Sequence, residues 1–145
     1  MPRLDAATLP DLPLEFMNAD HAREVALVNE LEDALAAYAR GDGPVASILV
    51  RLSLLAVHTR EHFLREESTM REARFPAYPV HKAEHDRVLA GMDAEARAFR
   101  AGGDPERLAR YLRETLPEWF EGHVRTMDVV TARFVAANAD ATGAL

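Results

Sequence analysis

The chain contains no cysteine among its 145 residues. Disulfides, iron–sulfur clusters, cysteine-type zinc sites and cysteine nucleophiles are therefore excluded, and any bound metal must be held by nitrogen and oxygen ligands. No apolar run approaches the roughly 18 residues that a membrane span requires. The acidic, proline-broken N-terminus is unlike a signal peptide. We therefore expect a cytoplasmic protein without a membrane span.

Positive charge is also scarce, with 17 Lys and Arg against 24 Asp and Glu and a formal net charge of −7. Nucleic acids and anionic membranes are bound by clustered basic side chains, whereas the Lys and Arg residues here are dispersed. We expect neither partner. A small neutral ligand or an unidentified protein partner fits this composition better, and the length suits one domain that is a monomer or a weak oligomer.

The N-terminal segment should be an extended arm, because Pro2, Pro10 and Pro13 fix the backbone and remove hydrogen-bond donors. A helix should follow, with Asn18 and Asp20 as candidate N-caps. Its apolar residues recur at three-to-four spacing up to the GDGP break at 41–44, and His21 lies on the same stripe. That stripe comprises Val25, Val28, Leu31 and Leu35.

Three further helices follow from the same periodicity. The second should begin near Pro44 and end near Ala73, and its inward face holds Ile48, Leu52, Leu55, Thr59, His62 and Glu66. The third should open at Pro79 and carries His81, His85, Val88, Met92 and Phe99 on one face. The fourth should begin at Asp104-Pro105 and carries Leu108, Leu112, Trp119, His123, Met127, Val130 and Phe134.

Pro117 interrupts the fourth helix, where it removes one backbone hydrogen bond and clashes with the carbonyl of Arg113. A kink is expected rather than a break, because the apolar stripe resumes beyond it. Four helices with short connections predict an all-α, up-down-up-down antiparallel four-helix bundle. We divide the chain into an N-terminal arm packed on the bundle (1–17), the four-helix domain (18–137) and a C-terminal tail (138–145).

Five of the six histidines and two carboxylates lie on the core-facing stripes of these helices. Spacings of four residues place both members of a pair on one side of a helix, about 40° apart. The pair at 123 and 128 is five residues apart and reaches one centre only if the side chains wrap or the helix is locally widened. The set is His21, His62, Glu66, His81, His85, His123 and Asp128.

Each pair alone also has a structural explanation, such as a partly buried histidine beside a solvated carboxylate. Together they are harder to explain in that way, because each of four helices places a histidine where an unpaired polar ring costs free energy. Imidazole and carboxylate suit iron, manganese or zinc, and seven such ligands exceed the usual complement of one ion. The sequence therefore predicts a buried two-metal site.

At these residues the chain resembles the hemerythrin family. The matching segments are D-H at 20–21 with V-N-E-L after it, H-F-L-R-E-E-S-T-M at 62–70, H-K-A-E-H at 81–85, and W-F-E-G-H-V-R-T-M-D at 119–128. They cover nearly the whole predicted domain. The resemblance implies a four-helix bundle around a non-haem di-iron centre that binds O2 reversibly, in oxygen carriage, storage or sensing, and that is not an enzyme.

Carried over residue by residue, the resemblance assigns His81, His85 and His123 to one iron. His21 and His62 would bind the second iron, which keeps an open position for O2. Glu66 and Asp128 would bridge both ions together with an oxo or hydroxo group. The same site would also suit nitric oxide response, iron storage or peroxide chemistry, which the sequence does not separate from O2 binding.

The wall of the O2 pocket has four candidate residues, Trp119, Phe120, Val25 and Leu55, and plain core packing explains them equally well. Members of the family often have leucine where Phe120 stands, so the larger ring should narrow access. His58 lies four residues before His62. It is a buried residue supporting the ligands, an exposed ring or an extra ligand, and we favour the first because it shares the inward side of its helix.

Two enzyme classes also use motifs of this kind. The segment His81-x-x-Glu84-His85 formally matches a zinc peptidase pattern with Glu84 as the base, but it explains only two of the histidines. Ferritin-like di-iron oxidases need a Glu-x-x-His motif on each of two helices, and no glutamate in this chain is followed by histidine at that spacing. Both are weaker interpretations than the oxygen-binding site.

Overall fold

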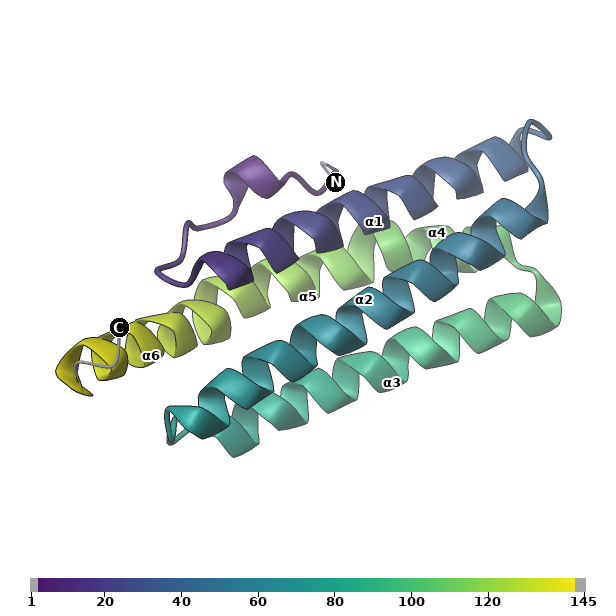
Figure 1. The fold of residues 1–145 in the computed structure, drawn as a ribbon. Helices are drawn as coiled ribbons and strands as arrows, with labels where there is room; N and C mark the ends of the chain where they lie inside the picture. The colour runs from purple at the N-terminus through teal and green to yellow at the C-terminus, as the bar shows by residue number, and fades with distance from the viewer. Residues whose placement is uncertain (1–2, 143–145) are drawn as a thin grey trace.

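The computed structural model describes residues 3–142, and within that range every regular element is a helix (Figure 1). Three long helices come first: α1 (Glu15–Ala39), α2 (Val45–Glu72) and α3 (Tyr78–Gly102). A fourth rod is built from five consecutive pieces: α4 (Pro105–Arg110), η2 (Tyr111–Thr115), α5 (Leu116–His123), η3 (Val124–Asp128) and α6 (Val129–Thr142). The predicted all-α four-helix bundle is confirmed.

Short connections make neighbouring helices antiparallel. Helix α1 packs beside α2, α2 beside α3, and the fourth rod contacts both α1 and α3, which closes the bundle (Figure 1). Gly103 ends α3 with a left-handed φ of 65°, and Asp104 then caps α4 by accepting hydrogen bonds from the backbone of Glu106 and Arg107. The core between the helices is apolar and fully buried at residues such as Leu31, Ile48 and Leu112.

The predicted start of the first helix, with Asn18 or Asp20 as its cap, is wrong. Helix α1 begins at Glu15, and its capping residue Leu14 makes no side-chain cap. Both predicted caps are occupied elsewhere, because Asn18 bonds the backbone of Leu12 and Asp20 pairs with Arg65 at 2.8 Å. A polar residue that can cap a helix can equally bond another segment, which the local sequence does not reveal.

The N-terminal segment lies along α1 and is anchored by both apolar and polar contacts (Figure 1). Leu4 and Leu12 are buried, and a short 3-10 turn, η1 (Ala6–Thr8), lies between them. Asn29 donates to the carbonyl of Leu4 at 3.0 Å, and Arg125 of the fourth rod donates to the carbonyl of Thr8 at 2.7 Å. The arm therefore touches the outside of two helices.

The fourth rod contains two widened, π-helical turns. The sequence predicts a widened helix only between His123 and Asp128, as one of two ways to bring those side chains to one centre. In η2 the backbone N–H of Leu116 donates to the carbonyl of Tyr111, five residues back, just before Pro117. In η3 the N–H of Val129 donates to the carbonyl of Val124 in the same way. Such turns shift the side chains that follow them relative to a regular α-helix.

This shift overturns one residue of the predicted inner stripe. Val130 is 56% exposed, whereas Thr131 and Ala132 next to it are buried. A regular α-helical period continued through η3 would place Val130 inside the bundle. The extra residue in the π-helical turn rotates the following side chains, so Thr131 and Ala132 face the core instead. Helix α6 also continues to Thr142, beyond Asn138, which donates to the carbonyl of Ala73 at 3.2 Å. Residues 1–2 and 143–145 of the predicted arm and tail lie outside the described range.

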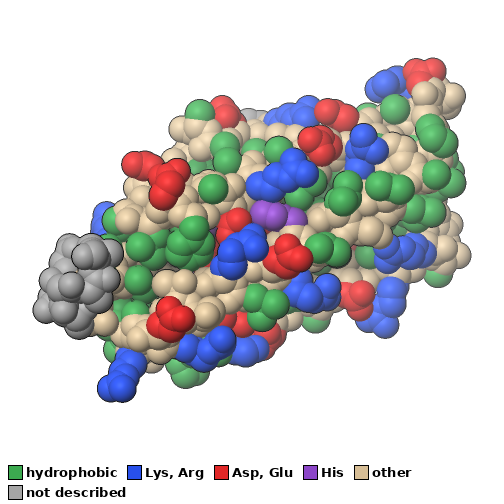
Figure 2. Space-filling model, viewed as in Figure 1, with side chains coloured by type: hydrophobic (Ala, Val, Ile, Leu, Met, Phe, Trp, Pro, Cys, Tyr) green, Lys and Arg blue, Asp and Glu red, His purple; other side chains and the backbone are tan. Residues whose placement is uncertain are grey.

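The visible surface carries basic and acidic side chains interspersed, with apolar side chains between them and histidine visible near the middle of this face (Figure 2). In residues 3–142 there is no helix of the length and hydropathy needed to cross a bilayer.

Replacing Asn18 with alanine should loosen the arm. The side chain accepts a hydrogen bond from the N–H of Leu12 and donates one to its carbonyl, both at 2.9 Å and partly buried. Leaving these groups unpaired should cost about 1–3 kcal/mol of unfolding free energy, measured by urea denaturation. Arg40→Ala, which removes an exposed ion pair with Asp42, is the control and should change stability by less than about 0.5 kcal/mol. Equal effects of the two substitutions would contradict the anchoring role.

Candidate metal centre

Four helices deliver the seven predicted residues to one buried cluster. His21 comes from α1, His62 and Glu66 from α2, and His81 and His85 from α3. The fourth rod supplies His123 and Asp128. Every one of these side chains is at most 5% exposed. The structure thus brings together all the residues that the sequence singled out as ligands.

The widened η3 turn explains how residues five apart on the fourth rod serve one centre. His123 ends α5 and Asp128 ends η3, so the π-helical turn lies between them. His123 Nε2 lies 3.1 Å from Asp128 Oδ1. In a regular α-helix the two side chains would be displaced by about 140° around the axis. Of the two conditions that the sequence left open, wrapped side chains or a locally widened helix, the widened helix is present.

One half of the cluster contains three histidines. His85 Nε2 lies 3.3 Å from Glu66 Oε1, and His81 Nε2 lies 3.1 Å from Asp128 Oδ1. His81 and His123 face each other with their Nε2 atoms 3.1 Å apart. One nitrogen or oxygen atom from each of these five residues lies within 4.8 Å of the others, a spacing suited to one ion.

The other half contains two histidines and uses the second oxygen of each carboxylate. His62 Nε2 lies 2.8 Å from Glu66 Oε2, and His21 Nε2 lies 2.9 Å from Asp128 Oδ2. Glu66 and Asp128 therefore each place one oxygen in the three-histidine half and the other oxygen in the two-histidine half. The cluster is a pair of adjoining, unequal sites that share two carboxylates.

Unpaired buried atoms test whether this arrangement fits a metal. Within the described part of the chain, Glu66 Oε1, Asp128 Oδ1 and His85 Nε2 are buried and have no hydrogen-bond partner. Polar atoms left in this way cost free energy, and a cation between them would satisfy all three. All three atoms belong to the three-histidine half. The residues present fit a bound metal ion.

The charges of the buried carboxylates and histidines also favour a cation at the centre of the cluster. Burial alone would lower the pKa of His62, but the carboxylates of Glu66 and Glu24 outweigh it and raise that pKa well above its usual value. Burial would likewise raise the pKa of Asp128, yet the neighbouring imidazoles of His123, His21 and His81 hold that pKa well below its usual range. Two buried carboxylates thus require positive charge at the centre, which protonated imidazoles or a metal cation can supply.

Groups outside the cluster contact the outer nitrogens of three of its histidines. His85 Nδ1 donates to Glu67 Oε2 at 2.9 Å, and His81 Nδ1 lies 2.8 Å from the hydroxyl of Thr131. His62 Nδ1 lies 3.4 Å from Glu24 Oε1. A donor N–H on one side of a neutral imidazole leaves the lone pair of the other nitrogen facing inward, as metal binding requires.

Sequence reasoning missed Glu24, Glu67 and Thr131. The sequence offered one indication of Glu67, because this second glutamate directly follows Glu66 on α2, five residues after His62. Glu24 had a weaker one, since it lies three residues after His21 on the same face of α1. Thr131 could not be found without knowing the phase shift introduced by η3.

His58 lies beside the cluster. Its side chain is 13% exposed, Nε2 lies 3.1 Å from the backbone carbonyl of Asp20, and the same atom is 3.6 Å from Glu24 Oε1. Its ring centroid lies 5.8 Å from that of His62. These contacts put His58 behind His62, next to the carboxylate that supports that ligand.

The aromatic candidates for the pocket wall divide between the two halves. Phe120 meets His21 edge-on, with ring centroids 5.6 Å apart, so it borders the two-histidine half. The described ring contacts of Trp119 are instead with His123, stacked at 4.5 Å, and with Phe63. Trp119 therefore lies against the three-histidine half, which differs from its predicted place beside the open position.

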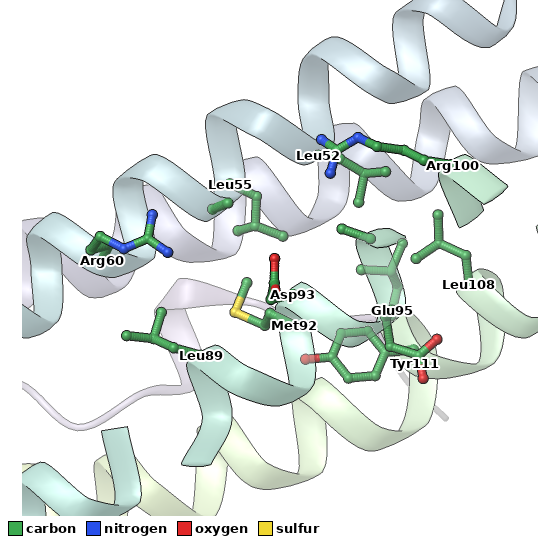
Figure 3. A pocket seen from close by; sticks show the side chains of 13 residues that line it. Leu52, Leu55, Arg60, Leu89, Met92, Asp93, Glu95, Arg100, Leu108 and Tyr111 are labelled. Atoms are coloured by element: carbon green, nitrogen blue, oxygen red, sulfur yellow. The ribbon is translucent and has the colours of Figure 1, made fainter. Parts of the chain in front are cut away.

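Val25 and Leu55 are buried in the apolar core that also contains Phe120. Leu55 additionally lines a cavity of about 60 Å³ between α2, α3 and the fourth rod. Figure 3 shows Leu55 of α2 facing Met92 of α3 across this cavity, with the ring of Tyr111 beside Met92. Burial, together with the nearby carboxylates of Glu95 and Glu24, raises the pKa of the Tyr111 phenol.

The position of Glu84 argues against the peptidase interpretation. Its carboxylate accepts hydrogen bonds from Arg87 and, at 2.6 Å, from the indole N–H of Trp119. The bonds from Arg87 and Trp119 hold the pKa of Glu84 at about 2. His81 and His85 join the buried cluster, while Glu84 is absent from every described group of possible ligands. A carboxylate so placed is a poor base for peptide hydrolysis.

Comparisons with known proteins agree with this geometry. The family model described as the hemerythrin HHE cation binding domain matches residues 12–133. A bacteriohemerythrin of Aquifex aeolicus is 36% identical over 118 residues, covering 81% of this chain and 86% of that protein. A bacteriohemerythrin of Ralstonia nicotianae is 36% identical over 119 residues, covering 82% and 79%.

Two solved crystal structures share the fold. Both are single-residue mutants, one of them described as a hemerythrin, and each superposes with a TM-score of 0.76 at 23% sequence identity. The superposition covers 93% of this chain and 97% of the other.

Adding Fe²⁺ or Zn²⁺ to metal-free protein should raise its unfolding temperature, because an ion that binds only the folded cluster stabilises that state. At an ion concentration of about 100 times Kd, the gain should be about 2.7 kcal/mol. His85→Ala, which removes an unpaired ligand nitrogen, should shrink this gain. Thermal unfolding that is insensitive to added metal and to chelator would show that the cluster binds no ion.

Proposed function

This chain belongs to the hemerythrin family, and we propose that its buried cluster holds two iron ions and binds O2 reversibly, without turning over a substrate. One observation carries the proposal. Glu66 and Asp128 each turn one oxygen into the half that contains three histidines and the other into the half that contains two, so the two halves are built unequally. An ion with fewer protein ligands is the one with room for an external ligand.

The ligand assignment follows the two halves. His81, His85 and His123 would hold one iron, and His21 and His62 the other. Glu66 and Asp128 would span both ions, and a bridging oxo or hydroxo group would complete the cofactor. When bound, the two iron ions would supply the electrons and the open coordination position that reversible O2 binding requires.

The chain's own residues would keep water away from that position. Phe120 is 3% exposed and meets His21 edge-on, and Val25 and Leu55 are buried in the same core. Apolar surroundings offer no proton donor and exclude solvent. They therefore favour the release of O2 unchanged over its reduction, protonation and release as peroxide. We assign Phe120, Val25 and Leu55 to the pocket wall on these grounds, and Trp119 to packing against His123.

Spectroscopy of the reduced, iron-loaded chain tests the function directly. Admitting O2 should produce a visible absorption band, and flushing with argon should remove it over repeated cycles, with two irons bound per chain. Iron content is measured alongside, and His62→Ala serves as the control that weakens the two-histidine half. Permanent oxidation on the first exposure would favour peroxide chemistry instead, and the absence of any band would overturn O2 binding.

Phe120→Leu should speed the association of O2 several-fold, because a smaller side chain opens space beside His21. The loss of buried carbon atoms should also lower stability by roughly 1–2 kcal/mol. Stopped-flow mixing of the reduced protein with O2 measures the rate.

Phe63→Leu is the matched control, since Phe63 stacks on His85 of the three-histidine half at 3.8 Å and meets His62 at the longer centroid distance of 5.2 Å. It should lower stability without a comparable change in the association rate. Equal rates for wild type and Phe120→Leu would remove Phe120 from the access route.

A further inference from the structure

Glu24 is a buried carboxylate that the ligand assignment does not use. It lies on α1, is 4% exposed, and stands one turn beyond His21. Its two oxygens have different neighbours: Oε2 lies 2.6 Å from the hydroxyl of Thr59, and Oε1 lies 3.4 Å from His62 Nδ1. Burying a carboxylate is costly, so its position against a ligand histidine calls for a physical account.

We propose that Glu24 is the positioning residue of the two-histidine half, which it serves by holding His62. Accepting a hydrogen bond from His62 Nδ1 places the N–H on the outer side of the ring and leaves the lone pair of Nε2 facing the cluster. An anionic partner also makes the imidazole a stronger donor to a metal. This inference rests on the proposed function, because it concerns retention of the second iron.

The neighbours of Glu24 support this role. Thr59 Oγ lies between Glu24 Oε2 and the carbonyl of Leu55, at 2.6 and 2.8 Å, and its single proton favours the closer, anionic acceptor. His58 Nε2 lies closer to the carbonyl of Asp20, at 3.1 Å, than to Glu24, at 3.6 Å. Oε1 of Glu24 is thus left for His62. The Tyr111 phenol on the fourth rod is also near enough to feel the charge of Glu24.

The three-histidine half contains the same device. Glu67 accepts a hydrogen bond from His85 Nδ1 at 2.9 Å, while His81 has only the neutral hydroxyl of Thr131. Each half therefore has one histidine supported by a buried glutamate. With one histidine fewer, the second half should depend more strongly on its glutamate. The chain thus provides a matched control for its own test.

The test is an anaerobic titration of the metal-free chain with Fe²⁺, in competition with a chelator, which resolves the two binding steps. Glu24→Gln keeps the size of the side chain but removes its charge. It should weaken the second step about 10- to 100-fold and leave the first unchanged. Glu67→Gln should weaken the first step instead. Affinity and stoichiometry are read without any measurement of O2.

The outcomes separate the two proposals. If wild type takes up fewer than two ions, the proposed function fails. If wild type takes up two and Glu24→Gln keeps the affinity of the second step, or loses both steps equally, only the assignment of Glu24 fails. Should Glu24→Gln not fold, Thr59→Val removes the hydroxyl that holds Glu24. That variant should show a smaller but equally selective weakening, and an unselective loss would overturn the assignment.

Discussion

The constraint on which this molecule depends is the burial of five imidazoles and two carboxylates at the centre of a small helical bundle. The apolar core on either side of the cluster can be packed by many combinations of residues, but seven polar groups without water cannot be accommodated without partners. Glu66 Oε1, Asp128 Oδ1 and His85 Nε2 lack hydrogen-bond partners among the described residues. The helices are therefore arranged around a cluster in which some polar atoms meet one another and the remaining unpaired ones would be satisfied by a cation.

That constraint reaches into the backbone of the fourth rod. A regular α-helix cannot aim residues 123 and 128 at one centre, and the η3 turn between them provides the necessary extra width. The same turn moves Thr131 inward, where its hydroxyl meets His81 Nδ1 at 2.8 Å, and moves Val130 to the surface. One local irregularity thus positions a proposed ligand and a group that supports another.

Sequence reasoning reached the fold and the seven clustered residues because both depend on periodicity, and His62 and Glu66 or His81 and His85 share a face in any helix. It did not reach the start of α1, because Asn18 and Asp20 satisfy groups in the arm and in α2 rather than capping their own helix. It also missed Glu24 and Thr131. Their partners lie far away in the sequence, and for Thr131 the relevant helical phase is set by a turn with no reliable sequence signal.

The glutamates behind the clustered histidines add a second difference between the two halves, besides the number of histidines. Three histidines against two would leave one half weaker, yet each half has a buried glutamate behind one histidine, at 2.9 Å for Glu67 and 3.4 Å for Glu24. The longer contact lies on the two-histidine side, where Phe120 also borders His21. For the reversible O2 binding that we propose, the ion should be held firmly enough to stay and should have few enough protein ligands to react. Two histidines, one of them held by the charged Glu24 through the longer contact, suit both requirements.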